Sequence, residues 1–289
     1  MKTYDIALDI KRIRAFFSLT QEEFARAVSS SRISILRYEK SEIFPTKSVI
    51  ENIYSFAYGD HGKTLNLNES KASLYLDNSG NSKLLFHGAK SEIKSDVDIY
   101  HSQFPNDFGA GFYAGETLNQ AASWVAANLD SSVYCFYFDG SGLKTMKFNV
   151  DRKWMYAILY YRGAFENRNI PKDVKDIITQ IDNVDYLIAP IADNQMYQTL
   201  NRFINNEITD EACLHALSST NLGLQYVFKT MKACQRLVCI DRLYLCKQER
   251  NDYLSIKEEL SAKGQQKANL SIIEYRRKGL YFDELFKGI

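Results

Sequence analysis

A change in the periodicity of apolar residues near residue 83 restricts the fold of this chain more than any other feature. Over residues 5–58, apolar side chains recur every three to four positions, which predicts a series of short helices. From Lys83 on, apolar or alternating runs bounded by turn residues predict strands. The strand runs are KLLFHGA, VYCFYF, KTMKFNV, YAILYY and DYLIAPI. Helices are expected at about 117–128, 171–180, 195–204, 209–218 and 225–234.

Because these strands and helices do not follow a regular βαβ rhythm, the pattern indicates an α+β fold. We predict an N-terminal all-α bundle over 1–60, followed by a linker over 61–82 that is rich in Gly, Asn and Ser. A mixed-sheet domain is expected over 83–242. The charged stretch 243–289 is predicted to be a helical extension, and its basic run Arg276–Lys278 is interpreted as a solvated helix face rather than a nucleic-acid contact.

Composition excludes several protein classes. The 289 residues carry a net charge of +1, and 13% of them are aromatic with only four Pro, which suits half-buried sheets and argues against disorder. No apolar run approaches the roughly 18 residues that a membrane helix needs, and the N-terminus lacks the apolar stretch of a signal peptide. The five Cys form no CxxC pair, so neither disulfides nor a metal site are expected. We therefore expect a cytoplasmic protein.

The N-terminal helices carry a recognisable order of motifs. Thr20 and Glu23 have the spacing of a capping box, and a short turn leads to a second helix from about Ser31. This stretch resembles the helix-turn-helix of the lambda-repressor/Cro-like family. The resemblance implies that Gln21 anchors the DNA backbone. It also implies that the helix after Ser31 enters the major groove, with the residues Arg32, Ser34 and Arg37 facing DNA.

Two features of this motif depart from a strong DNA-binding signature. The usual Gly of the turn is replaced by Ser29 or Ser30, which raises the cost of a positive φ there. From Arg26 to Lys47, five basic and two acidic residues give a net charge of +3, so we expect weak binding by one copy and a homodimer on DNA. The alternative is a helical bundle used for protein contacts.

Three short motifs in the mixed-sheet domain could together hold a planar ligand. His87 and Gly88 end a predicted strand, where Gly lets a ligand approach the backbone. Gly109 and Gly111 precede Phe112 and Tyr113, which places bare backbone beside aromatic rings. Trp124 lies on a predicted helix and adds a further ring. Taken singly, each has a structural alternative: a structural His, an ordinary turn and a core Trp.

In this order, the motifs resemble the ADP-ribosyltransferase superfamily in its diphtheria-toxin/PARP-like branch with a His–Tyr–Glu signature, and most of all the bacterial DUF3990 proteins. The resemblance implies a split mixed sheet that binds NAD+ as a substrate, without a metal. His87 would hold the adenosine ribose, and the backbone of Gly88 would meet the nicotinamide amide. Tyr113 would stack on nicotinamide beside Phe112, and Trp124 would close the pocket.

The third signature residue is changed in this chain. The position of the family's Glu, which hydrogen-bonds the nicotinamide ribose, is matched by Gln225. An amide can hold a ribose hydroxyl but carries no charge. Either Gln225 supports transfer or the domain binds NAD+ without transfer, and the carboxylates that could act instead are Asp107, Glu116, Asp193 and Glu211. Asp193 is also a predicted helix N-cap, and with Asn194 it could lie at the pocket rim.

The first hypothesis is therefore a mono-ADP-ribosyltransferase, with a macromolecular acceptor. An attached DNA-binding domain suggests autoregulation or targeting, as in toxin–antitoxin operons, with an antitoxin protein as a further partner. The second hypothesis is a non-catalytic transcriptional regulator whose transferase-like domain senses NAD+ or a related nucleotide. The third is a structural interaction protein. The first two differ in whether nicotinamide is released.

Overall fold

The computed structural model describes residues 3–100, 102, 106–166, 168–192, 194–219 and 223–286. They form two compact units, each built from separate stretches of the chain. The first comprises Met1–Ser95, Thr117–Asp139 and Val238–Ile256, and the second comprises Asp96–Glu116, Gly140–Leu237 and Lys257–Ile289. The predicted domain boundaries at residues 60 and 82 therefore fall inside the first unit.

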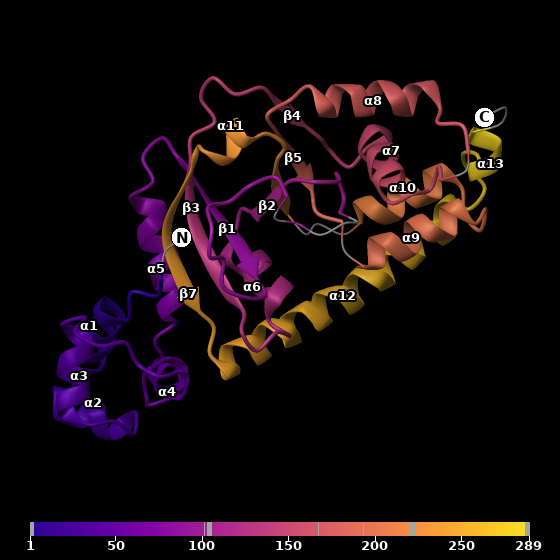
Figure 1. Ribbon diagram of the computed structural model, residues 1–289. Coiled ribbons are helices and arrows are strands. Elements are labelled where there is room, and N and C mark those ends of the chain that lie inside the picture. The colour runs from indigo at the N-terminus through magenta and orange to yellow at the C-terminus, as the bar shows by residue number, and fades with distance from the viewer. Residues whose placement is uncertain are drawn as a thin grey trace. The chain divides into compact units, whose positions relative to one another are not determined.

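The predicted helices at the N-terminus are present in the first unit (Figure 1). They are α1 (Ile6–Phe17), α2 (Gln21–Ala27), α3 (Arg32–Glu39) and α4 (Lys47–Tyr58). The expected capping box starts α2, because Thr20 Oγ1 accepts from the Glu23 amide and the Glu23 carboxylate accepts from the Thr20 amide. Completely buried side chains from all four helices, among them Ile13, Phe24 and Ile53, form one hydrophobic core.

A fifth helix, α5 (Leu67–Asp77), occupies the stretch that the sequence predicts to be a linker. It begins at Asn66, whose side chain caps the Glu69 amide. Its polar residue Lys71 is buried, and its ammonium contacts Asp9 of α1 at 2.9 Å and Asp241 at 2.7 Å. The linker prediction is therefore wrong for residues 67–77, which form a helix. Lys71 is buried there because its charge is paired with those of Asp9 and Asp241.

The remainder of the first unit is a group of strands with a covering helix. β1 (Lys83–Ala89) pairs antiparallel with β3 (Ser132–Phe138), and both agree with the sequence prediction. β7 (Leu237–Tyr244), which the sequence did not predict, lies next to β3. The predicted helix α6 (Leu118–Val125) packs against β1 and β3 (Figure 1).

The second unit has four strands in the order β4-β5-β6-β2. β4 and β5 are parallel, whereas β6 is antiparallel to both of its neighbours, so the arrangement is mixed as predicted. The strands are β2 (Phe112–Gly115), β4 (Thr145–Lys147), β5 (Tyr186–Pro190) and β6 (Leu224–Phe228). The helices are α7 (Arg152–Tyr161), α8 (Lys172–Asp182), α9 (Asn194–Ile204), α10 (Asp210–Ser218), α11 (Met231–Cys234) and α13 (Phe282–Leu285). The predicted helices at 171–180, 195–204 and 209–218 are confirmed.

Two sequence predictions in this unit are wrong. Residues 156–161, predicted as a strand, belong to α7, which Asp151 caps and which buries Trp154, Met155 and Leu159. A helix buried on several sides gives a nearly continuous apolar run, so its period cannot be read. Residues 225–234, predicted as a helix, form most of β6 and then the short α11.

The predicted C-terminal extension contains the longest helix, α12 (Lys247–Tyr275), with 29 residues. Its first ten residues belong to the first unit and the others to the second. Charged and polar side chains are spread along it. Among the described residues, no helix is both long and apolar enough to span a bilayer.

Candidate functional site

A buried polar cluster in the second unit is centred on Asp107, which precedes β2 and is 6% exposed. Its Oδ1 accepts from Arg162 at the end of α7, at 2.9 Å, and from the hydroxyl of Tyr197 on α9. Its Oδ2 accepts from Gln225 of β6 at 2.8 Å and from the Ala192 amide at 3.3 Å. Four structural elements therefore converge on one carboxylate.

Gln225, the predicted replacement for the family's Glu, lies in this cluster. It is 8% exposed and sits opposite Gly115 in the β2–β6 register. Its Nε2 donates to Asp107 and, at 3.2 Å, to the carbonyl of Pro190. Nothing in the described part of the chain donates to its Oε1, which leaves this oxygen as a free acceptor.

The loop from Asp107 to Gly111 is held in place by three side chains. Lys229 Nζ donates to the carbonyls of Phe108 and Ala110 at 2.7 and 2.8 Å, and burial lowers the pKa of this ammonium. The Tyr113 hydroxyl donates to the Gly109 carbonyl at 2.7 Å, and Ser102 Oγ donates to the Gly111 carbonyl at 2.6 Å. The loop is therefore a fixed platform in front of β2.

The backbone geometry explains why both Gly109 and Gly111 are glycines. Gly109 has a φ of +71°, a conformation that other residues adopt at a cost. A Cβ on Gly111 would lie 2.9 Å from the Phe228 carbonyl oxygen, so only Gly allows β6 to approach this closely. The predicted glycine pattern thus positions Tyr113, and it does not by itself require a ligand.

Of the two predicted aromatic residues on β2, only Tyr113 is partly exposed. Phe112 is completely buried, and its ring lies 6.2 Å from that of Phe228. The pKa of Tyr113 is raised, first by burial and second by the charge of Asp107. Its hydroxyl therefore stays protonated and can serve as the donor to the Gly109 carbonyl.

His87 and Gly88 lie on β1 of the first unit. Leu84 and Phe86 pack with α6 residues, and a Cβ on Gly88 would lie 2.3 Å from the Ala121 carbonyl oxygen of that helix. Since side chains alternate along a strand, His87 faces away from α6, on the side of its partner Tyr134. Gly88 is thus explained by the close approach of α6.

Trp124 is 57% exposed on α6, so it is not the core residue of the structural alternative. His87 points to one face of β1, whereas α6, which carries Trp124, covers the opposite face. Tyr113 and Gln225 belong to the other unit. The binding of one dinucleotide by His87, Tyr113 and Trp124 remains a prediction.

The other candidate carboxylates have different surroundings. Glu116 follows β2 and accepts a long hydrogen bond of 3.4 Å from Tyr226. Glu211 on α10 pairs with Arg152 at 2.5 Å. Asp193 and the side chain of Asn194 lie outside the described residues. Asp107, by contrast, accepts hydrogen bonds from four described residues.

The N-terminal residues predicted to contact DNA differ in their contacts. Arg32 and Arg37 are exposed on α3, and Arg37 Nε lies 3.6 Å from Glu42. Ser34 is tied to the N-cap Ser31 by a hydrogen bond of 2.9 Å between their hydroxyls. Gln21 donates to Glu39 at 2.7 Å, which uses one of its two N–H groups.

The turn between α2 and α3 has the expected backbone. Ser29 has a φ of +55°, the left-handed conformation for which the usual residue is Gly. Ser30 donates its amide to the Ala25 carbonyl at 2.8 Å and closes the turn. The sequence predicts a serine with a positive φ at position 29 or 30, and the structure confirms it at Ser29.

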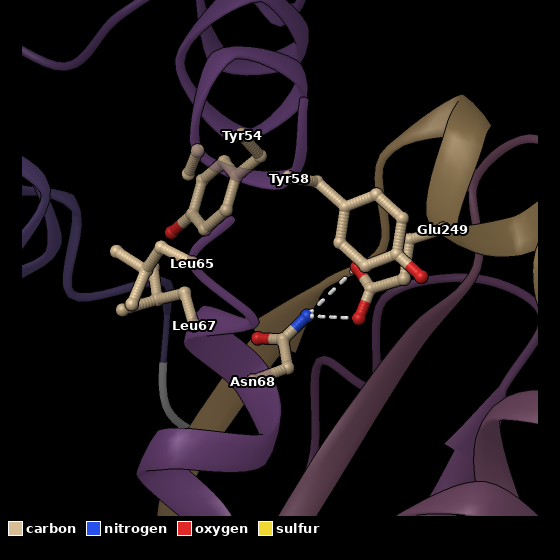
Figure 2. A pocket seen from close by; sticks show the side chains of 7 residues that line it. Tyr54, Tyr58, Leu65, Leu67, Asn68 and Glu249 are labelled. Atoms are coloured by element: carbon tan, nitrogen blue, oxygen red, sulfur yellow. Dashed lines mark hydrogen bonds between the residues drawn. The ribbon is translucent and has the colours of Figure 1, made fainter. Parts of the chain in front are cut away.

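A small cavity in the first unit lies apart from the predicted site residues, none of which lines it (Figure 2). Tyr54 and Tyr58 of α4, Asn68 of α5 and Glu249 of α12 contribute to its wall, together with Ala57, Leu65 and Leu67. Asn68 Nδ2 donates to both Glu249 oxygens at 3.0 Å. Burial raises the pKa of Glu249 to about 7.

No group of three or more His, Cys, Asp or Glu side chains is placed to hold a metal ion within the ranges that the structure describes. A family described as "Protein of unknown function (DUF3990)" matches residues 84–238, more than half of the chain. The chain belongs to the DUF3990 family. Comparison with curated proteins and with solved structures gave no significant match.

The DUF3990 match starts in β1 and ends in β7. It includes His87, Tyr113, Gln225 and the whole Asp107 cluster, and it leaves α1–α5, α12 and α13 outside. Sequence reasoning missed Arg162 and Tyr197, which lie 55 and 90 residues from Asp107. No local spacing could have joined them to it.

Proposed function

We propose that this DUF3990 protein is an NAD+-dependent mono-ADP-ribosyltransferase whose N-terminal helices bind DNA. The observation that carries the proposal is the state of Gln225, a nearly buried amide. Among the described residues its nitrogen makes both of its side-chain hydrogen bonds, and none of them donates to its carbonyl oxygen. A ribose hydroxyl needs such an acceptor. The resemblance to the His–Tyr–Glu transferases supplies the reaction and the role of this position.

In the proposed reaction, the bond between ribose C1′ and the nicotinamide nitrogen breaks, and both electrons leave with nicotinamide. Positive charge develops on the ribose, as in glycoside hydrolysis. A lone pair of the acceptor then bonds to C1′, and the acceptor gives up a proton to solvent. The chain's own task is to orient the ribose and to lower the energy of this charge.

The residues divide this task according to their chemistry. Tyr113 offers a ring whose position is fixed by its hydroxyl, which donates to Gly109. Gln225 Oε1 accepts from the nicotinamide ribose. The resemblance assigns the adenosine ribose to His87 and a second aromatic contact to Trp124. Phe112 supports the β2–β6 pair from the core, which is a structural role.

The proposal is tested with the purified full-length chain, labelled NAD+ and cell lysate. Wild type is expected to release nicotinamide and to label an acceptor. The His87→Ala and Tyr113→Ala variants should lose at least about tenfold in turnover, the loss of one well-placed contact. His61→Ala, a histidine of the same unit as His87, is the matched control and should keep wild-type activity. Equal labelling by wild type and His87→Ala would refute the assignment of His87.

The alternative of a sensor is favoured by the neutral side chain at position 225, because an uncharged group stabilises developing positive charge less than a carboxylate does. For DNA binding, the support is the positive φ of Ser29 and the two exposed arginines of α3. A sensor would change its affinity for operator DNA when NAD+ is added and would release no nicotinamide. A transferase releases nicotinamide whether or not DNA is present.

A further inference from the structure

The contacts of Asp107 assign it a role in the proposed reaction that neither the family resemblance nor the sequence provides. We infer that Asp107 is a positioning residue: it holds the amide of Gln225 so that the carbonyl oxygen, and not the N–H₂ group, faces the substrate. This inference rests on the proposed function, because it names what sets up Gln225 for that reaction.

Asp107 itself has no capacity left for a substrate. A carboxylate has about four lone-pair positions, and Asp107 accepts from Arg162, Tyr197, Gln225 and the Ala192 amide. The residue is 6% exposed. It therefore acts through a neighbour rather than by touching the ribose.

The Gln225 amide has only one orientation that satisfies its surroundings. Both groups near its terminal nitrogen, Asp107 Oδ2 and the Pro190 carbonyl, are acceptors. A flipped amide would place its oxygen against a carboxylate and a carbonyl, which repel it. Since Asp107 carries the charge, it contributes most to this preference.

The pair also supplies part of what a glutamate would provide. A carboxylate that accepts from the amide N–H polarises the amide and increases the negative charge on its oxygen. The charge of Asp107 thereby supports the acceptor that meets the ribose. No proton moves between Asp107 and Gln225 in this arrangement, and the bond between C1′ and the nicotinamide nitrogen still breaks with both electrons leaving on nicotinamide.

An exchange of the two functional groups tests the inference. Asp107→Asn removes the charge and allows the Gln225 amide to flip. This variant should therefore have a kcat at least about tenfold lower, while its KM changes less than about threefold. Gln225→Glu places two carboxylates in contact, so one of them should hold a proton and activity should rise with an apparent pKa above that of an ordinary carboxyl. In the double variant, the new amide at 107 donates to the new carboxylate at 225. We expect it to recover at least half of wild-type kcat.

The matched control is Asp210→Asn. Asp210 is a buried carboxylate of the same unit, 1% exposed, that pairs with Arg152 at 2.7 Å. Its loss should destabilise the fold to a similar degree without changing kcat. Urea denaturation of each variant, and NAD+ binding by calorimetry, separate lost stability from lost positioning.

Three results would overturn the inference. The first is an Asp107→Asn variant with the kcat of Asp210→Asn. The second is a double variant no better than its worse parent, and the third is a Gln225→Glu profile with no added pH dependence. If Asp107→Asn does not fold, the Gln225→Glu profile and the double variant still decide. A wild-type chain that neither binds NAD+ nor releases nicotinamide refutes the proposed function, and the inference with it.

Discussion

Replacement of Lys71 by Met should cost this protein a large part of its stability. The Lys71 ammonium, 2% exposed, lies 2.9 Å from Asp9 and 2.7 Å from Asp241, whose side chains are 1% and 4% exposed. Tyr54 and Tyr75 each donate a hydrogen bond of 2.6 Å to one of these carboxylates. One cation thus compensates two buried anions on α1 and β7.

Without Lys71, both carboxylates remain buried. Asp9 keeps the Tyr54 hydroxyl and a longer ion pair of 3.8 Å with Arg12, and Asp241 keeps the Tyr75 hydroxyl and the Arg242 amide. Removal of one partner from a buried ion pair typically costs about 3–5 kcal/mol, which is a large share of the roughly 5–15 kcal/mol that stabilises a folded domain. Burial already raises the pKa of Asp9 despite Lys71. In the variant this pKa rises further above its unfolded value, so the lost stability should be larger at pH 8 than at pH 5.

Urea denaturation followed by circular dichroism measures this loss. Lys11→Met, an exposed lysine of α1, is the matched control and should change the free energy of unfolding by less than about 0.5 kcal/mol. The triple variant Lys71→Met, Asp9→Asn, Asp241→Asn should recover much of the loss, because no uncompensated charge remains. A loss below about 1 kcal/mol for Lys71→Met alone would show that α5 is not anchored by this network, and the reasoning would be refuted.

Three further outcomes follow from single sites. The pKa of Glu249 is about 7 in the folded state and 4.5 for the free group, so the free energy of unfolding should fall by about 3 kcal/mol as pH rises from about 4.5 to 7. Urea midpoints at pH 5 and 8 should show most of this fall. The Glu249→Gln variant should not show it. Ser29→Gly should raise the unfolding free energy by about 0.5–1 kcal/mol, because it relieves a left-handed backbone; an unchanged urea midpoint would contradict this. Gly88→Ala should lose at least about 2 kcal/mol, since its Cβ would meet the α6 backbone at 2.3 Å, and thermal unfolding should show a clear drop in Tm.

The sequence predicts those features that depend on neighbouring residues. The capping box of Thr20 and Glu23 is local, and so is the Ser-rich turn that adopts a positive φ at Ser29. Helix α5 could not be predicted in this way, because the partner that makes Lys71 a buried residue, Asp241, lies 170 positions further along. The helix α7 was missed for the opposite reason: most of its residues are apolar, so no exposed face marks its period.

The candidate site shows the same division. His87, Tyr113 and Gln225 can be selected from their order in the sequence, and Asp107 can be named as one carboxylate among several. What distinguishes Asp107 is that Arg162, Tyr197 and Gln225 all donate to it, and these arrive from three separate elements. A set of hydrogen bonds to a common centre depends on packing, and sequence spacing does not contain it.

Gly88 illustrates why loss of activity alone is weak evidence for a binding residue. From the sequence alone, Gly88 is interpreted as a position where a ligand can approach the backbone. The structure explains it instead by the close approach of α6 to β1. Both explanations predict that Gly88→Ala impairs an enzyme, so turnover cannot distinguish them. Stability can: the packing explanation requires a loss in the ligand-free chain, while a glycine kept only for a ligand would leave it unchanged. The same reasoning makes the Asp107 and Gln225 exchange a stronger test than either single variant, since recovery of activity in the double variant has no explanation in stability alone.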